Sequence, residues 1–217
     1  MFGLNLEFSR ICRPWTTYNI QSFSFNVHEH NMPLPKIIKT ETLAATRFFK
    51  IEAMHLEFST GEQRVYERLP AGVSSGVIVV AINENDELML IREYAAGFHE
   101  FQLTLPKGAV DQGETLEIAA DRELAEEIGF AARVIEFVKC LSIAPGHMGY
   151  TINVMFAQDL YAKVLPGDEP EPPELVLWPL SRLDELLQSD QFNEARAIAA
   201  LTLCQSRLAA ANATHKI

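Results

Sequence analysis

Gly76–Ile82 is the segment that most constrains the fold of this chain. It reads Gly-Val-Ile-Val-Val-Ala-Ile, so a strand built from it has no polar side chain on either face. Successive side chains of a strand point to opposite faces, and a strand with two apolar faces is stable only where both are covered. The run therefore predicts a central strand that is buried on both sides.

The segments that follow it predict a mixture of strands and helices. Apolar patterning predicts strands at Leu88–Ile91, Val134–Ser142, Ile152–Gln158 and Leu175–Trp178. Helical spacing predicts helices at Leu116–Ile128, Ser181–Leu187 and Asn193–Ala211. Residues 167–174 read Gly-Asp-Glu-Pro-Glu-Pro-Pro-Glu, and because prolines remove donors and fix φ, this segment predicts an acidic loop.

The region before the central strand divides into two parts. Residues 32–75 hold alternating stretches such as Met54-His55-Leu56-Glu57-Phe58, and they predict a β-meander of two or three strands. A meander of this size does not bury a core alone, so it must pack on the following domain or on a second subunit. Residues 1–31 are either an extension that is non-native or disordered, with translation starting at Met32, or natural sequence. The expected divisions are thus 1–31, 32–75 and 76–217.

The composition excludes some classes of function. The chain has 18 Lys and Arg against 29 Asp and Glu, a formal net charge of -11. Such a chain lacks the basic surface that nucleic acid requires, although a bound dication could still attract small polyanions. The three cysteines have no disulfide or zinc spacing, and no apolar run resembles a membrane span or a secretion signal. We expect a cytoplasmic protein with neither a nucleic-acid nor a membrane partner.

The predicted helix at Leu116–Ile128 carries the chemistry. Thr115 is placed to cap its first turn, and Gly129 to end it in a left-handed conformation. An apolar stripe recurs at every fourth residue, and another face carries the carboxylates of Glu123, Glu126 and Glu127. Clustered carboxylates repel one another, and a hard dication such as Mg²⁺ or Mn²⁺ offsets that repulsion. The alternative is a solvated acidic face.

The three glutamates stand in a fixed frame. From Gly108 to Phe130 the sequence fits the pattern G-x5-E-x7-R-E-U-x-E-E-x-G-U, in which U is a bulky apolar residue. The other fixed positions are taken by Glu114, Arg122, Leu124 and Gly129. The segment resembles the Nudix box, and so many matches within 23 residues make a chance fit remote. The resemblance implies the Nudix α/β/α sandwich, with a mixed sheet between helices, and a pyrophosphate hydrolase.

The resemblance also implies a role for each residue of the box. Glu123, Glu126 and Glu127 would bind Mg²⁺, or Mn²⁺ in its place, and Glu126 and Glu127 count with the catalytic groups. A main-chain carbonyl near the first glycine, that of Lys107 or Gly108, would complete the ligands. Two further residues would brace the loop and helix, namely Glu114 and Arg122. The metal would polarise phosphoryl oxygens and lower the pKa of the attacking water.

A wider resemblance bears on the substrate. From Met32 onward most of the chain is similar to the NudE-type branch of this family, the ADP compounds hydrolases. The similar segments include Leu90–Tyr94, Gly167–Pro172 and Phe192–Arg196. This similarity implies a small ADP-containing substrate such as ADP-ribose, NADH or a short diadenosine polyphosphate, with AMP as a common product. It also implies a homodimer, with 32–75 as the unit that dimerises.

Two features around the box refine the expected specificity. Pro145 lies 15 residues after Phe130, an offset that resembles the ADP-ribose pyrophosphatases, or it belongs to an ordinary turn. The entry into the box at Thr104–Gly108 reads Thr-Leu-Pro-Lys-Gly, where many ADP-ribose pyrophosphatases have Glu-Leu-Pro-Ala-Gly. The missing glutamate is compatible with a broader specificity for ADP compounds.

Further contacts with the substrate are expected from residues outside the helix. Glu169 or Glu171 of the acidic loop could serve as general base, or the loop could be a solvated linker. Arg92 could hold a phosphate in its guanidinium fork, or pair with an adjacent carboxylate or strand. Lys107 is another candidate for substrate binding, and Tyr94 could stack on adenine or belong to the core.

Two other functions stay open. One is a Nudix pyrophosphatase for another nucleotide sugar, a dinucleotide or coenzyme A. The other is a non-catalytic domain that binds ADP-ribose, although this chain keeps every glutamate of the box and has no basic helix-turn-helix pattern.

Overall fold

The computed structural model describes residues 33–70, 75–167 and 169–214, with side chains described as far as residue 210. The two interpretations of residues 1–31 therefore lie outside the described residues. The predicted central strand is β4 (Gly76–Ala81), and all of its residues are buried. Buried side chains cover it on both faces, as its apolar sequence predicts.

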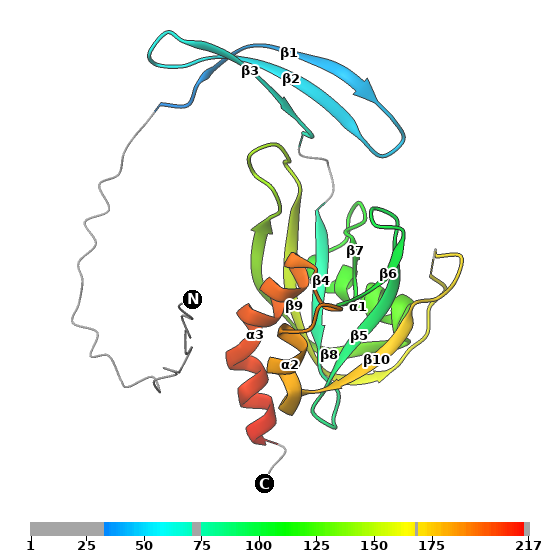
Figure 1. Ribbon diagram of the computed structural model, residues 1–217. Helices are drawn as coiled ribbons and strands as arrows, with labels where there is room; N and C mark the ends of the chain where they lie inside the picture. The colour runs from blue at the N-terminus through cyan, green and yellow to red at the C-terminus, as the bar shows by residue number, and fades with distance from the viewer. Residues whose placement is uncertain (1–32, 71–74, 168, 215–217) are drawn as a thin grey trace, which may run out of the picture. The chain divides into compact units, whose positions relative to one another are not determined.

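β4 lies inside a four-stranded mixed sheet (Figure 1). It pairs in parallel with β9 (Thr151–Ala162) and antiparallel with β7 (Lys107–Ala109), while β8 (Phe130–Ser142) pairs antiparallel with β9. A second sheet has the order β10-β5-β6 and is antiparallel. Its strands are β10 (Glu174–Pro179), β5 (Glu87–Ala95) and β6 (Glu100–Thr104).

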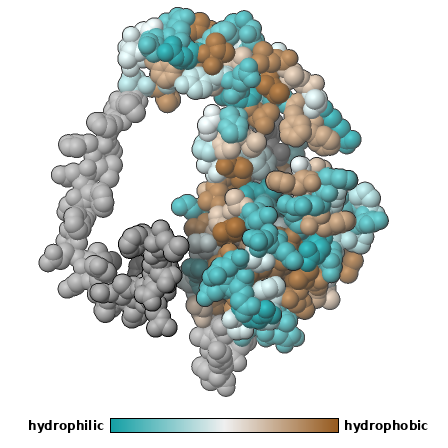
Figure 2. All heavy atoms as spheres, viewed as in Figure 1, coloured by the Kyte–Doolittle hydropathy of each residue, from teal (hydrophilic) through white to brown (hydrophobic). Residues whose placement is uncertain are grey.

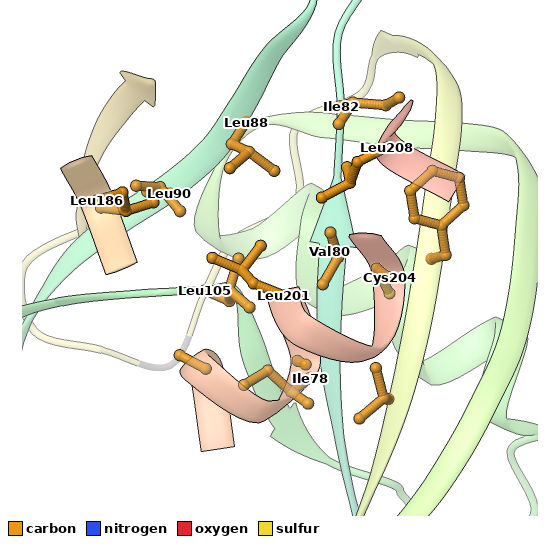
Figure 3. Close-up of a cluster of buried hydrophobic side chains, with 14 of the residues drawn as sticks. Ile78, Val80, Ile82, Leu88, Leu90, Leu105, Leu186, Leu201, Cys204 and Leu208 are labelled. Carbon is orange, nitrogen blue, oxygen red and sulfur yellow. The ribbon is translucent and has the colours of Figure 1, made fainter. Parts of the chain in front are cut away.

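Different helices cover the two faces of these sheets. One core packs on α1 (Leu116–Glu127) and takes Val77, Val79, Met89 and Ile91 from β4 and β5. The other core packs on α3 (Ala195–Thr214) and takes the alternate residues Ile78, Val80, Leu88 and Leu90 (Figure 3). The period of two of a strand thus divides β4 and β5 between two cores. This is the α/β/α arrangement with a mixed sheet that the sequence resemblance implied.

Helix α1 begins and ends where its sequence predicts. The side chain of Thr115 accepts a hydrogen bond from the amide of Ile118 at 3.3 Å, which satisfies one of the free donors of the first turn. Gly129 has φ of 74°, a conformation that costs little only without a Cβ. The two ends fix which glutamates stand on which turn of the helix.

The N-terminal meander has three antiparallel strands in the order β1-β2-β3. They are β1 (Lys36–Ala45), β2 (Lys50–Glu57) and β3 (Gln63–Arg68). Many of their large apolar side chains are exposed, among them Ile37, Ile38, Leu43, Val65 and Tyr66. Figure 2 shows hydrophobic side chains at the surface of this unit between hydrophilic ones. The sheet has too few buried residues of its own to form a core.

The structure adds elements that the sequence pattern does not predict. β6 and the short β7 carry no clear alternation of apolar residues. The helix expected at Ser181–Leu187 is a 3₁₀ turn, η1 (Leu180–Arg182), followed by α2 (Leu183–Leu187). Among the described residues, no helix is both long enough and apolar enough to cross a membrane.

Candidate active site

Glu123, Glu126 and Glu127 of α1 line a cavity of about 760 Å³. β7 contributes Lys107 and Gly108 to the same cavity. The segment after β9 and the acidic loop contribute another wall, with Val164, Leu165, Pro166, Gly167, Glu169, Pro172 and Pro173. The predicted metal ligands and one of the two predicted general bases therefore border one space.

Gly108 allows β7 to approach α1 closely. A Cβ at this position would lie 2.1 Å from an Oε atom of Glu123, where atoms cannot overlap. Glu123 is itself buried, at 7% exposure, so its carboxylate has little room to withdraw. A glycine is required here because the carboxylate occupies the space of a side chain.

Arg122 ties the loop before α1 to the glutamates. Its guanidinium donates to both carboxylate oxygens of Glu114, at 2.9 and 3.0 Å, and to the carbonyl oxygen of Ala109 at 2.8 Å. It also donates to Glu123 at 2.8 Å and to Glu126 at 2.9 Å. Arg122 holds the pKa of Glu114 below its usual value, and these carboxylates, Glu114 first, raise the pKa of Arg122. These are the contacts that a bracing role requires, and that role of Glu114 and Arg122 stays a prediction.

Glu127 has a different partner. Its carboxylate accepts a hydrogen bond from the backbone amide of Lys107 at 2.9 Å. Loss of contact with water raises the pKa of Glu127 to about 8, and the neighbouring carboxylates of Glu123 and Glu93 add to this, while Lys107 opposes it. A carboxyl in such surroundings gains strongly from a nearby cation.

The orientation of β7 distinguishes the two main-chain carbonyls considered as ligands. The carbonyl of Pro106 accepts a hydrogen bond from β4 at 2.8 Å, and carbonyl directions alternate along a strand. Gly108, two residues later, therefore also turns its carbonyl to β4. The carbonyls of Lys107 and Ala109 turn to the opposite edge, where Arg122 donates to Ala109. The Lys107 carbonyl thus lies on the side of β7 that the side chains of α1 reach.

The donors around the cavity fit a hard dication by their chemistry. They are carboxylate oxygens with no sulfur or imidazole among them, the set that Mg²⁺ and Mn²⁺ prefer. Within the described part of the chain, no three His, Cys, Asp or Glu side chains are arranged to hold a metal ion. The carboxylates of Glu123 and Glu126 contact Arg122, and the carboxylate of Glu127 contacts the amide of Lys107.

Family models match nearly all of the chain beyond the N-terminal segment. The NUDIX domain matches residues 73–201, which include the cavity, α1 and β7. The NudE-type Nudix hydrolase N-terminal domain matches residues 35–68, the three-stranded meander. The chain belongs to the NudE-type Nudix hydrolases.

Comparison with individual proteins supports the same family. The chain is 46% identical to the ADP compounds hydrolase NudE of Escherichia coli over 80% of its length and 93% of that protein. It is 23% identical to an ADP-ribose pyrophosphatase of Bacillus subtilis, over 58% of this chain and 69% of that one. A crystal structure of an ADP compounds hydrolase is 45% identical and superposes with a TM-score of 0.79, covering 82% of this chain and 96% of that one. Nudix hydrolases as a family use divalent metal ions.

The alternation of β5 separates two predicted substrate contacts from the cavity of this Nudix hydrolase. Odd-numbered residues of β5 pack toward α1, and even-numbered ones toward α3. Arg92 and Tyr94 are even-numbered and do not line the cavity. Arg92 is ion-paired with Glu174 of β10 at 3.3 Å. This contact fits the alternative in which Arg92 pairs with a neighbouring strand. The hydroxyl of Tyr94 lies 2.8 Å from Nδ1 of His99.

Two other predicted residues also lie outside the cavity lining. Pro145 stands in the loop between β8 and β9, where the carbonyl of Ala144 accepts the amide hydrogen bonds of an ordinary turn. Glu171 of the acidic loop is exposed, whereas Glu169 of the same loop lines the cavity. Of the residues proposed for substrate binding, only Lys107 is brought to the glutamates.

Among the acidic residues beside the site of this Nudix hydrolase that the sequence pattern does not predict are two that contact Lys107. Glu93 lines the cavity and its carboxylate is ion-paired with the ammonium of Lys107. It could have been found, because Met89, Ile91 and Glu93 share one face of the strand. Glu194 lies 3.9 Å from the same ammonium. No local pattern identifies Glu194, since its partner Thr104 is 90 residues away in the sequence.

Proposed function

We propose that this chain hydrolyses the pyrophosphate bond of ADP-linked compounds and releases AMP and a phosphorylated partner. The expected substrates are ADP-ribose, NADH and short diadenosine polyphosphates. The observation that carries the proposal is that the three box glutamates of α1, Glu123, Glu126 and Glu127, line one cavity, in a chain that is 46% identical to an ADP compounds hydrolase over 93% of that protein. Two other similar proteins are named ADP-ribose pyrophosphatases, and these names support the same substrate class.

Mg²⁺ is the proposed metal, with Mn²⁺ as a substitute, held by Glu123, Glu126, Glu127 and a main-chain carbonyl. The orientation of β7 favours the carbonyl of Lys107 over that of Gly108. When bound, the ion polarises the phosphoryl oxygens, offsets their charge and lowers the pKa of the attacking water. A bound ion would compete with Arg122 for Glu123 and Glu126, while two hydrogen bonds to Glu114 keep the guanidinium beside the cavity.

Glu169 is the better-supported general base outside the helix. It lines the cavity that the helix glutamates also line, and Glu171 does not. A base must reach the proton that it removes, directly or through one water, so lining the cavity is a first requirement. Glu126 and Glu127 are the competing candidates from within the box. Arg92, Tyr94 and Pro145 stay predictions as substrate contacts.

A substrate panel tests this proposal. Purified protein with Mg²⁺ is offered ADP-ribose, NADH, diadenosine triphosphate, GDP-mannose and coenzyme A, and the products are identified. We expect cleavage of the first three with release of AMP. Cleavage of only GDP-mannose or coenzyme A would replace the proposal with the alternative pyrophosphatase, and binding of ADP-ribose without any cleavage would favour the non-catalytic module.

We also propose that the unit 32–75 joins two copies of the chain into a homodimer. The exposed apolar side chains of β1–β3 support it, because a soluble monomer rarely leaves several such side chains close together on one small sheet. The division into 1–31, 32–75 and 76–217, and the cytoplasmic location, stay predictions from the sequence.

A further inference from the structure

A cluster of charged side chains joins β5, β7 and the start of α3 beside the cavity. Lys107 is its centre, because its ammonium is ion-paired with Glu93 and lies 3.9 Å from Glu194. The side chain of Lys107 is only 10% exposed, and that of Glu194 16%. A lysine so far from water is stable only where carboxylates surround its charge.

Besides Lys107, two other side chains contact the carboxylate of Glu194. The hydroxyl of Thr104, at the end of β6, donates to one of its carboxylate oxygens at 2.5 Å. The guanidinium of Arg196 is paired with the other oxygen. The carbonyl of Glu194 accepts the amide hydrogen bond of Ile198 at 3.0 Å, in the first turn of α3. The carboxylate is therefore fixed relative to both β6 and α3.

Lys107 connects this cluster to the metal helix. While its ammonium contacts Glu93 and Glu194, its backbone amide donates to the carboxylate of Glu127. One residue thus orients a box glutamate with its main chain and holds a positive charge a short distance from that glutamate. Where this ammonium rests determines whether it competes with a cation for the box glutamates.

We propose that Glu194 is a positioning residue for the metal-binding glutamates and that it acts through Lys107. The inference rests on the metal-binding role of the box in the proposed function. With Glu194 in place, the ammonium is shared between two carboxylates outside the box. Without Glu194, it loses one of them and turns toward the remaining acidic groups, Glu127 among them, where it opposes binding of the dication.

The test measures binding of Mn²⁺ alone, followed by the electron paramagnetic resonance signal of the free ion. Glu194→Gln keeps the size of the side chain and removes its charge. We expect its affinity for Mn²⁺ to fall roughly tenfold, the low end of the range for residues that orient metal ligands, because Glu194 acts through Lys107. Glu185→Gln is the matched control and should leave the affinity unchanged, because Glu185 of α2 pairs with Arg182 of η1 at the exposed surface.

A double-mutant cycle separates positioning from a merely structural effect. In a Lys107→Met background no ammonium competes with the ion, so Glu194→Gln should not weaken Mn²⁺ binding further. The inference is overturned if Glu194→Gln binds Mn²⁺ as the parent does. It is also overturned if the loss persists undiminished in the Lys107→Met background, which would point to damage at the start of α3.

The outcome is distinguishable from failure of the proposed function. No substrate takes part, so an enzyme with other substrates would still give the expected pattern. If the parent and Glu127→Gln bind Mn²⁺ equally, the box is not the metal site, and both the proposal and this inference are overturned.

Discussion

At the scale of single residues, the site depends on close contacts between β7 and α1. Gly108 leaves room for the carboxylate of Glu123, and the next residue back, Lys107, orients Glu127 through its amide. Arg122 reaches Glu114, Glu123 and Glu126 with one guanidinium. The box pattern therefore specifies contacts as well as ligands.

Gly108→Ala should disable the site with limited damage to the fold. The added Cβ would stand 2.1 Å from the Glu123 carboxylate, which must move by an ångström or more. Displacement of a reacting group by about 1 Å costs about 100-fold in rate. We expect a fall in kcat/KM of this size and weaker binding of Mn²⁺, measured by AMP release and by metal titration. Gly146→Ala, where an added Cβ meets nothing within 4 Å, is the control and should retain parent activity.

The sequence predicts the box residues and their spacing, but only some of their partners. Spacing along a helix places Glu123, Glu126 and Glu127 on neighbouring turns without any knowledge of tertiary structure. The roles of Glu93 and Glu194 depend on how β5, β7 and α3 pack. Pairing over 90 residues, as between Thr104 and Glu194, leaves no periodic signal in one sequence.

At the scale of elements, a strand or helix with a long apolar pattern is easier to predict from the sequence than a short strand that carries polar side chains. β4 is apolar on both faces and was predicted to within a residue, and α1 has a cap at each end. β6 and β7 were missed because β7 has three residues and both carry polar side chains. α3 was expected to begin at Asn193 but begins at Ala195, because the carbonyl of Glu194 accepts the first hydrogen bond of the helix, from the amide of Ile198.

Gly129→Ala should destabilise the end of α1. At φ of 74° an alanine is strained, and the cost of a left-handed residue with a Cβ is about 1 to 2 kcal/mol. Denaturant unfolding should report this loss in the free energy of unfolding. Gly97→Ala, at a glycine without positive φ or close neighbours, should show no such loss, and equal stability of the two variants would contradict the assigned role of Gly129.

Because of Cys204, the stability of the folded chain should depend on pH in the alkaline range. Burial of its thiol among apolar side chains raises its pKa from 9.0 to about 11. Below pH 9 the thiol is protonated in the folded and the unfolded chain alike. Between pH 9 and about 11 the unfolded chain releases the proton and the folded chain keeps it, so stability falls as pH rises, by about 2 to 3 kcal/mol in total.

Cys204→Ala removes this titration and is the comparison that isolates it. The parent and the variant differ in packing at every pH, and that difference is constant. We expect the stability advantage of the parent at pH 8 to shrink as pH approaches 11, measured by urea unfolding. An advantage that stays constant over this range would show that the thiol does not titrate as its burial implies.

At the scale of the whole molecule, the meander of β1–β3 accounts for the proposed dimer. The chain has a mass of 24.3 kDa, so sedimentation equilibrium should give about twice this value. Val65 and Tyr66 are neighbouring exposed residues whose side chains point to opposite faces of β3. At least one of Val65→Glu and Tyr66→Glu should shift the protein toward monomer, while Gln63→Glu on the same strand should not. Dimers of unchanged stability in both variants would place the contact elsewhere.

The central claim is that the glutamates of α1 carry a metal-dependent hydrolysis of ADP compounds. Glu127→Gln tests it most directly, since it removes one carboxylate charge and keeps the shape of the side chain. The measurement is the rate of AMP release from ADP-ribose at saturating Mg²⁺, with circular dichroism as a check on folding. We predict that the parent releases AMP and ribose 5-phosphate, and that the folded variant is at least about 100-fold slower. A folded Glu127→Gln protein with parent activity, or a parent that releases no AMP from any ADP compound, would contradict the account.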